Sequence, residues 1–231
     1  MYHSLIISGK NTFTEWGMVP TSRPVVAPPE VKTTYVDLPA SDGVLDYTSL
    51  MLGRTPYGQR TGSWEFALKP GKNWSAVYTS LLNFLHGAVH RVILEDDPLF
   101  FYSGRLSVNE WKSDPAYSTI TIDYNLDPFR QSISASDDAD WLWNDVFEKN
   151  IRYGSFEVDG EKYRNLINDG LLPTTPVITC SAAMTVTYEG ADYRLVAGRN
   201  RNANLSLRQG DNIMVFKGKG TVSFHYREES L

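Results

Sequence analysis

Apolar and polar residues alternate with a period of two along much of the chain, which is the pattern of strands with one buried face. The clearest example is Ser63–Leu68, in which Trp64, Phe66 and Leu68 alternate with polar or small residues. Further strands are predicted at Ser4–Ser8, Val31–Leu38, Arg91–Leu94, Phe100–Trp111 and Ser118–Asn125. The first half of the chain is therefore expected to be built on a sheet.

One segment has a helical period instead. Between Trp74 and Leu85, apolar residues recur at offsets of three, four, seven, eight and eleven, with Leu81 in the middle of the stripe. Asn73 is a suitable N-cap and Gly87 suits the position just after the helix. We expect this helix to pack its apolar face against the sheet.

The second half of the chain shows three hairpin signals around glycine-containing turns. They are Phe156–Arg164 around Asp159-Gly160, Met184–Leu195 around Glu189-Gly190, and Ile213–Arg227 around Lys217–Gly220. This half is predicted to be an all-β sandwich.

A change of composition separates the two halves. Between Gln131 and Asp140, Ser and Asp crowd together with almost no apolar residue, which is typical of an interdomain linker. At 231 residues the chain is long enough for two domains. The prediction is a mainly β protein with an N-terminal β-sandwich or barrel-like domain carrying one α-helix, residues 1–132, and a C-terminal β-sandwich, residues 133–231.

Composition and charge exclude several classes of protein. The formal net charge is −5 and neither half is basic, so no nucleic-acid partner is expected. The single cysteine, Cys180, cannot form an internal disulfide and is expected to be a buried thiol. Gly170–Tyr188 is uncharged but contains prolines and repeated Thr, so we predict a strand pair and no membrane span. Met1–Lys10 lacks the pattern of a secretory signal, which fits cytoplasmic production.

Sequence signatures of catalysis and cofactor binding are missing, including the phosphate-binding G-x-x-x-x-G-K-[ST], the dinucleotide G-x-G-x-x-G, H-E-x-x-H and G-x-S-x-G. His86 and His90 have the spacing of two ligands on one helix face, and acidic residues follow at 95–97. Gly87 interrupts the helix between them, so a polar helix exit and an acidic turn are the simpler interpretation. No catalytic, cofactor-binding or metal-binding residue is predicted, and no cofactor.

Two neighbouring tryptophans are the candidate ligand-stacking residues. Trp141 and Trp143 would share one face of a strand and could stack on a sugar ring, although two core tryptophans explain them more simply. The nearby acidic residues at 137, 138 and 140 lack the glycine and glutamate of a calcium loop, so a solvated linker accounts for them.

Several short sequence segments, taken together and in their order along the chain, resemble a known family. They are T-S-R-P-V-V-A-P-P-E-V-K-T (Thr21–Thr33), G-S-W-E-F (Gly62–Phe66), L-L-N-F-L-H-G (Leu81–Gly87), V-I-L-E-D-D-P (Val92–Pro98), G-R-L-S-V-N-E-W (Gly104–Trp111) and G-D-N-I-M-V-F-K-G-K-G-T-V-S-F-H-Y-R (Gly210–Arg227). Together they are similar to the distal tail proteins of long-tailed (siphovirus-type) bacteriophages that infect Gram-positive hosts. Asn144–Pro176 resembles the family least.

The resemblance implies a structural protein of the virion, made and assembled in the host bacterial cytoplasm. The N-terminal domain would form a homohexameric ring, and the C-terminal domain would be a galectin-like β-sandwich projecting outward. The ring would be a hub at the tail tip or baseplate. It would contact the tail tube protein on one side and the tail-associated lysin or baseplate hub protein on the other, with receptor-binding protein sometimes on the outer domains. No galectin sugar-contact residue can be matched to this sequence.

One strand signal fits such a ring. Val31–Leu38 follows a proline-rich passage and has no obvious hairpin partner nearby, and an unpaired edge strand invites pairing with a neighbouring copy. Long-range pairing within the domain would explain it equally well. Two other functions are weighed against the hub. One is a carbohydrate-binding module using Trp141, Trp143, Tyr188 and Tyr193, and the other is a glycan-cleaving enzyme, for which no carboxylate pair can be assigned to a cleft.

Overall fold

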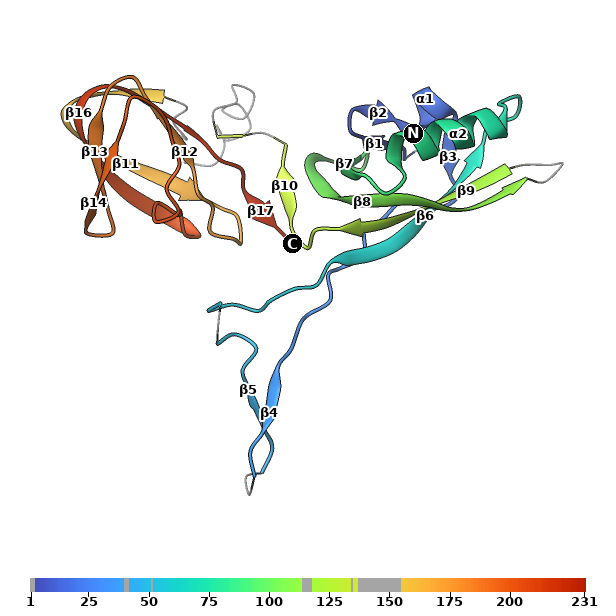
Figure 1. Cartoon of the computed structure of the whole chain (residues 1–231), viewed down its shortest axis with the longest axis horizontal. Helices are drawn as coiled ribbons and strands as arrows, with labels where there is room; N and C mark the ends of the chain where they lie inside the picture. The colour runs from blue at the N-terminus through green and yellow to red at the C-terminus, as the bar shows by residue number, and fades with distance from the viewer. Residues whose placement is uncertain (1–2, 40–41, 51, 114–117, 134, 137–154) are drawn as a thin grey trace. The chain divides into compact units, whose positions relative to one another are not determined.

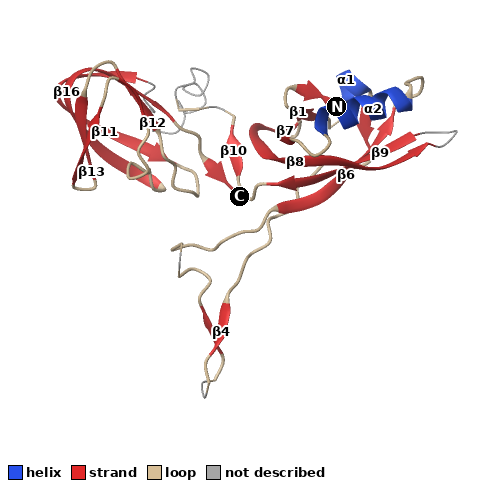
Figure 2. Cartoon of the chain, in the orientation of Figure 1, coloured by secondary structure: helices blue, strands red, loops and turns tan. Residues whose placement is uncertain are grey.

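The computed structural model of the chain describes residues 3–39, 42–50, 52–113, 118–133, 135–136 and 155–231. The chain forms two compact units, Met1–Arg130 with Leu231 and Gln131–Ser230, called unit 1 and unit 2 below. Each has its own hydrophobic core. Strands dominate the described residues of both units (Figure 2), so the predicted mainly β fold is confirmed. None of the helices in the described ranges has the length and apolar character needed to cross a bilayer.

Unit 1 is built on one antiparallel sheet. Its strands and helices are β1 (Leu5–Ile7), β2 (Lys10–Asn11), α1 (Thr12–Trp16), β3 (Met18–Pro20), β4 (Tyr35–Asp37), β5 (Val44–Asp46), β6 (Arg60–Leu68), α2 (Trp74–Leu85), β7 (Val89–Leu94), β8 (Asp97–Ser113) and β9 (Ser118–Leu126). The sheet order is β2-β1-β7-β8-β9-β6-β3, with β4 and β5 outside it (Figure 1).

The core of unit 1 lies between α2 and one face of the sheet. In β6 the predicted alternation holds, because Trp64, Phe66 and Leu68 are buried while Ser63 and Glu65 are exposed. In β9 the buried face includes Ile120, Ile122 and Tyr124, as predicted. Val77, Leu81 and Leu85 of α2 pack into the same core.

Helix α2 begins and ends where the sequence indicates. The Asn73 side-chain oxygen accepts hydrogen bonds from the backbone N–H groups of Ser75 and Ala76, at 3.1 and 3.3 Å. These bonds satisfy two N–H groups that have no partner inside the helix. Gly87 follows the C-cap with φ of +78°, a backbone conformation that glycine adopts without strain. The predicted helix is confirmed.

Unit 2 is a second curled β structure. Its strands are β11 (Ser155–Asn168), β12 (Val177–Cys180), β13 (Met184–Tyr188), β14 (Ala191–Leu195), β15 (Gly198–Asn200), β16 (Gly210–His225) and β17 (Glu229–Ser230), and β17 pairs with β10 (Arg130–Ser132). The order β14-β13-β16-β12-β15 forms one sheet, and β11 pairs with β16 on its other side. The uncharged segment Gly170–Tyr188 contains β12 and β13.

Only one of the three predicted hairpins is present. Met184–Leu195 forms the β13–β14 hairpin, with Glu189 and Gly190 at φ of +51° and +79° in the turn. The predictions at Asp159-Gly160 and Lys217–Gly220 are wrong. Both glycine sites lie inside long strands, where Gly160 pairs directly with Gly218 in the β11–β16 ladder. Cross-strand pairing along this ladder overrides the local turn preference of these residues.

Strand β16 changes neighbours near its glycines, where its partner switches from β13 to β12. Gly218 and Gly220 have φ of +151° and +149°. A Cβ at Gly218 would lie 2.7 Å from the Cβ of Met184, and one at Gly220 would lie 2.5 Å from Ser181 Oγ. The close approach of the neighbouring chain therefore requires glycine at both positions.

Residues 135 and 136 of the predicted linker are buried and belong to unit 2. Ala135 and Ser136 are each 4% exposed. The Ser136 hydroxyl donates to the Phe224 carbonyl and accepts from the Tyr226 N–H, each at 3.0 Å. A small polar side chain can thus anchor a segment that has few apolar residues. Residues 137–140 lie outside the described residues.

Candidate interaction surface

The residues singled out from the sequence for ligand stacking cannot be placed as a group. Trp141 and Trp143 lie outside the described residues, as do the acidic residues at 137, 138 and 140. Tyr188 is buried, and its hydroxyl hydrogen bonds to Asn212 Oδ1 at 2.7 Å. Tyr193 packs half-buried against the core of unit 2. Burial removes Tyr188 from any stacking surface, whereas Tyr193 stays partly exposed.

The two spaced histidines have separate structural roles. His86 caps α2, and its Nδ1 accepts a hydrogen bond from the Val108 N–H at 3.1 Å. His90 lies in β7, with its Nδ1 3.0 Å from the Ser8 hydroxyl and its ring tilted against Phe84. Burial lowers the pKa of His90 and favours its neutral form. Among the described residues, no group of three or more His, Cys, Asp or Glu side chains is placed to hold a metal ion.

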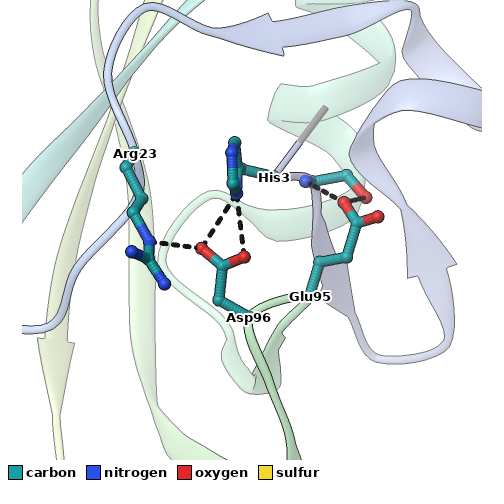
Figure 3. Close-up of polar contacts among 5 residues, drawn as sticks. His3, Arg23, Glu95 and Asp96 are labelled. Atoms are coloured by element: carbon teal, nitrogen blue, oxygen red, sulfur yellow. Dashed lines mark hydrogen bonds and ion pairs between the residues drawn. The ribbon is translucent and has the colours of Figure 1, made fainter. Parts of the chain in front are cut away.

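The acidic turn between β7 and β8 is joined to two other segments of unit 1 by hydrogen bonds and ion pairs, which together are called the clamp below (Figure 3). His3 Nδ1 lies 2.8 Å from one carboxylate oxygen of Asp96, and Arg23 Nε donates to the other at 2.7 Å. Glu95 accepts from the backbone N–H and the hydroxyl of Ser4, at 2.6 and 3.0 Å. The hydrogen bonds from His3 and then Arg23 lower the pKa of Asp96. The clamp joins the N-terminal strand, the segment after β3 and the turn.

The cysteine is buried in a strand. Cys180 ends β12 and is 2% exposed. Burial raises the pKa of its thiol, which keeps the thiol protonated and unreactive at neutral pH. The predicted buried thiol is confirmed.

The most exposed apolar surface in the described residues of unit 1 is a two-stranded ribbon, residues 31–39, 42–50 and 52–57, formed by β4, β5 and the segments that lead to them. Val31 and Tyr57 form a bridge at its base, and Tyr35, Val36 and Asp37 pair with Asp46, Leu45 and Val44. The prediction that Val31–Leu38 lacks a nearby hairpin partner is wrong, because β5 follows within ten residues. The sheet of unit 1 does not extend to either strand (Figure 1).

The ribbon exposes apolar side chains to an unusual degree. Tyr35 is 57% exposed, Val36 40% and Leu50 70%. Other exposed apolar residues of the ribbon are Val31, Leu38, Val44, Leu45, Tyr47 and Leu52. An isolated two-stranded ribbon is marginally stable in water. Contiguous exposed apolar surface of this kind marks sites of protein interaction.

One face of the ribbon is concave. It encloses a pocket of about 600 Å³ lined by Thr34, Val36, Tyr47, Thr48, Leu50, Leu52 and Pro56. Since opposite residues of an antiparallel pair lie on the same face, Val36 and Leu45 share this side, while Asp37 and Asp46 lie on the other. The face of Val36 and Leu45 is called the apolar side below, although Tyr35 and Val44 are exposed beside Asp37 and Asp46 on the opposite face.

The whole architecture has a counterpart among solved structures. The chain shares its fold with the Dit protein of phage SPP1. The match covers 100% of both chains with a TM-score of 0.65 and 13% sequence identity. No family model matches the chain. The curated proteins likewise contain no sequence match.

The SPP1 Dit protein is a hub of the adsorption apparatus in phages that infect Gram-positive bacteria. Its likeness to this chain extends over both units, and at 13% identity it is a likeness of fold. The short sequence segments indicate a resemblance to distal tail proteins, and the shared fold confirms this resemblance.

Sequence reasoning missed the ribbon as an element. The signal was present, since two short apolar-rich segments, Tyr35–Asp37 and Val44–Asp46, flank a stretch with Pro39 and Asp42-Gly43. What the sequence did not reveal is that the apolar residues of this hairpin face solvent, because exposure depends on whether any other element covers them.

Proposed function

We propose that this chain is the hub subunit of a siphovirus-type phage tail tip, in a phage that infects Gram-positive bacteria. The observation that carries the proposal is the shared fold with the SPP1 Dit protein over the full length of both chains. The protein is made and assembled in the host bacterial cytoplasm and resides in the virion tail. Its role is structural, and it acts by binding other proteins.

The hub is a homohexameric ring. Residues 1–132 form the ring and residues 133–231 form a galectin-like sandwich outside it. The ribbon supports this arrangement, because its apolar side has no cover among the described elements of unit 1. In a closed ring built from identical head-to-tail contacts, the ribbon of every subunit is covered by the neighbouring subunit.

The ring joins two parts of the tail. The tail tube protein binds on one side, and the tail-associated lysin or baseplate hub protein binds on the other, with receptor-binding protein carried by the outer domains. Six copies match the symmetry of a sixfold tube.

The chain is not an enzyme in this proposal. The carboxylates of Asp96 and Glu95 are occupied in joining segments of unit 1. Purified protein is expected to release no reducing sugar from peptidoglycan or host polysaccharide. Sustained release that is abolished by changing one carboxylate would contradict the proposal.

The ring is tested by measuring mass at low and high protein concentration, using native mass spectrometry and light scattering. We expect a hexamer whose population rises with concentration. Val36→Asp places a charge on the apolar side of the ribbon and is expected to weaken assembly at least about tenfold. Val196→Asp, at an exposed valine of unit 2, is the matched control and should have little effect.

A two-fold dimer made through unit 2 would contradict the ring and would favour a carbohydrate-binding role for that unit. Equal loss of assembly in both valine variants would show that the ribbon is not the contact.

A further inference from the structure

In the sheet of unit 1, no described strand pairs with the first half of β6 on the β3 side, which is called the open edge below. The segment from Thr21 to Glu30 runs beside this edge and is hydrogen bonded to the backbone at its two ends, to Glu65 and Gly58. Glu65 accepts a backbone hydrogen bond from Thr21 at 3.0 Å, so its carbonyl points to the β3 side of the sheet. Because this direction repeats every second residue, the N–H and C=O groups of Ser63 and Thr61 point the same way. Strand β3 pairs only with Phe66–Leu68, and no described strand pairs with Thr61 or Ser63 on that side.

The ribbon has a matching open edge on β4. Tyr47 donates to the Thr34 carbonyl at 2.9 Å, which directs the backbone groups of Thr34 and Val36 toward β5. The N–H and C=O groups of Tyr35 and Asp37 therefore point away from the ribbon. On each edge, two residues at positions i and i+2 direct their backbone N–H and C=O groups outward.

A groove of about 250 Å³ with a mixed polar and apolar lining lies beside the open edge of β6. It is lined by Ser22, Arg23, Val25, Ala27, Thr61, Gly62, Ser63, Trp64, Glu65 and Tyr124. Trp64 stacks on Tyr124 at 4.3 Å between ring centroids, and the indole N–H donates to the Val25 carbonyl at 2.9 Å. These contacts fix the positions of side chains that line the groove. Val25 is 66% exposed on this surface and has no apolar cover.

The side-chain faces agree when the two edges are paired. If Tyr35 and Asp37 pair with Thr61 and Ser63, these four residues share one face of the extended sheet, because side chains alternate with period two. Val36 then lies on the other face, together with Gly62 and Trp64. The side of the ribbon with Val36 and Leu45 meets the groove, and the opposite side, with Tyr35 and Asp37, continues the exposed face of β6.

We propose that the ribbon of one copy of this chain binds the open edge of β6 in a second copy, by adding β4 to the sheet of unit 1. The proposal rests on the hub assembly proposed above and names its contact. Main-chain hydrogen bonds supply affinity, and the groove beside Val25 and Trp64 receives the apolar side of the ribbon. When this contact is repeated from copy to copy, each ribbon binds one β6 edge and each β6 edge binds one ribbon.

The contact is tested by cysteine cross-linking between copies. Cys180→Ala removes the native thiol and provides the background chain. One set of variants carries Tyr35→Cys or Asp37→Cys, and a second set carries Thr61→Cys or Ser63→Cys. Each ribbon variant is mixed with each β6 variant under mild oxidation, so that only disulfides between copies are scored. Ala203→Cys, in an exposed loop of unit 2, replaces either partner as the control.

The expected result is a covalent dimer in one consistent register, either 35 with 63 and 37 with 61, or 35 with 61 and 37 with 63. Ala203→Cys should give none. A ring that has the mass of a hexamer but shows no ribbon-to-β6 disulfide would overturn this contact and leave the proposed hub intact. A chain that stays monomeric at high concentration, with no disulfide, would overturn both.

A backbone variant tests the same contact independently of cysteine. Ser63→Pro removes the outward N–H of an edge position, and proline is tolerated at such positions. Ser63→Ala keeps this N–H and is the matched control. We expect the concentration needed for half-assembly to rise at least about tenfold for Ser63→Pro and less than about threefold for Ser63→Ala. Equal shifts in the two variants would overturn the strand-addition contact.

Discussion

Leu81 shows how strongly single side chains determine the stability of unit 1. It is fully buried between α2 and the sheet. Leu81→Ala is expected to lower the free energy of unfolding by about 2–5 kcal/mol, since the cavity adds to the lost burial. Leu50→Ala, at a residue that is 70% exposed, should change it by less than about 0.5 kcal/mol. Denaturant unfolding followed by tryptophan fluorescence measures both, and a loss near zero for Leu81→Ala would contradict the helix packing.

Asp96 gives unit 1 a dependence on acid pH. Its carboxyl has an ordinary pKa of 3.8, and hydrogen bonds from His3 and then Arg23 lower that pKa in the folded chain. A lowered pKa contributes stability above the unfolded value, and the contribution is lost as the pH falls through the folded value. The stability difference between the native chain and Asp96→Asn should therefore be constant above about pH 5 and shrink below about pH 4.

The measurement is the urea midpoint of both chains across this pH range. Asp159→Asn is the control, because Asp159 is highly exposed and lies 3.8 Å from Lys219 in a surface ion pair. Such pairs contribute little. A difference for Asp96→Asn that stays the same from pH 5 to pH 3 would show that the clamp does not depend on the charge of Asp96.

At the scale of elements, strand β16 depends on glycine where it changes partner. Gly218→Ala adds a Cβ that would lie 2.7 Å from the Met184 Cβ at a φ of +151°. We expect it to destabilise unit 2 by about 2–5 kcal/mol through strain and overpacking. Gly190→Ala, also at positive φ but with open space around it, should cost only about 1–2 kcal/mol. Equal losses in urea unfolding would mean that the close contact with β13 relaxes freely.

The ribbon has little packing of its own among the described residues. Its two strands are three residues each, and its apolar residues are exposed. A short pair of strands without a covering layer is marginal. Amide hydrogens at Val36 and Leu45 are therefore expected to exchange quickly in the monomer and, if the proposed ring forms, slowly in that ring. Unchanged exchange on assembly would contradict a role of the ribbon in the contact.

At the scale of the whole molecule, the two units have separate cores. The core of unit 1 uses residues from Leu5 to Leu126, and that of unit 2 uses residues from Phe156 to Tyr226. A chain of residues 1–130 is therefore expected to fold alone, with a cooperative thermal transition and the near-UV signal of packed tryptophans. A fragment without a cooperative transition would show that unit 1 needs unit 2 to fold.

The sequence by itself determined the features that depend on neighbours along the chain. The period-two pattern predicts β6 and β9, and the period of α2 with Asn73 and Gly87 predicts its ends, because burial of one face and capping are local properties. The Glu189-Gly190 turn is also local, since a two-residue hairpin is held by its own flanking strands.

Tertiary structure alone decided what became of similar local signals elsewhere. Asp159-Gly160 has the composition of a hairpin turn, yet it continues a strand because Gly160 pairs with Gly218 across β11 and β16. The same holds for the ribbon, whose strands are rich in apolar residues that would suit a buried face. Whether that face is covered depends on elements far away in sequence, and here none of the described elements of unit 1 covers it. Whether a residue is buried depends on the elements that pack over it. A local sequence pattern can therefore predict an apolar face but cannot predict what covers that face.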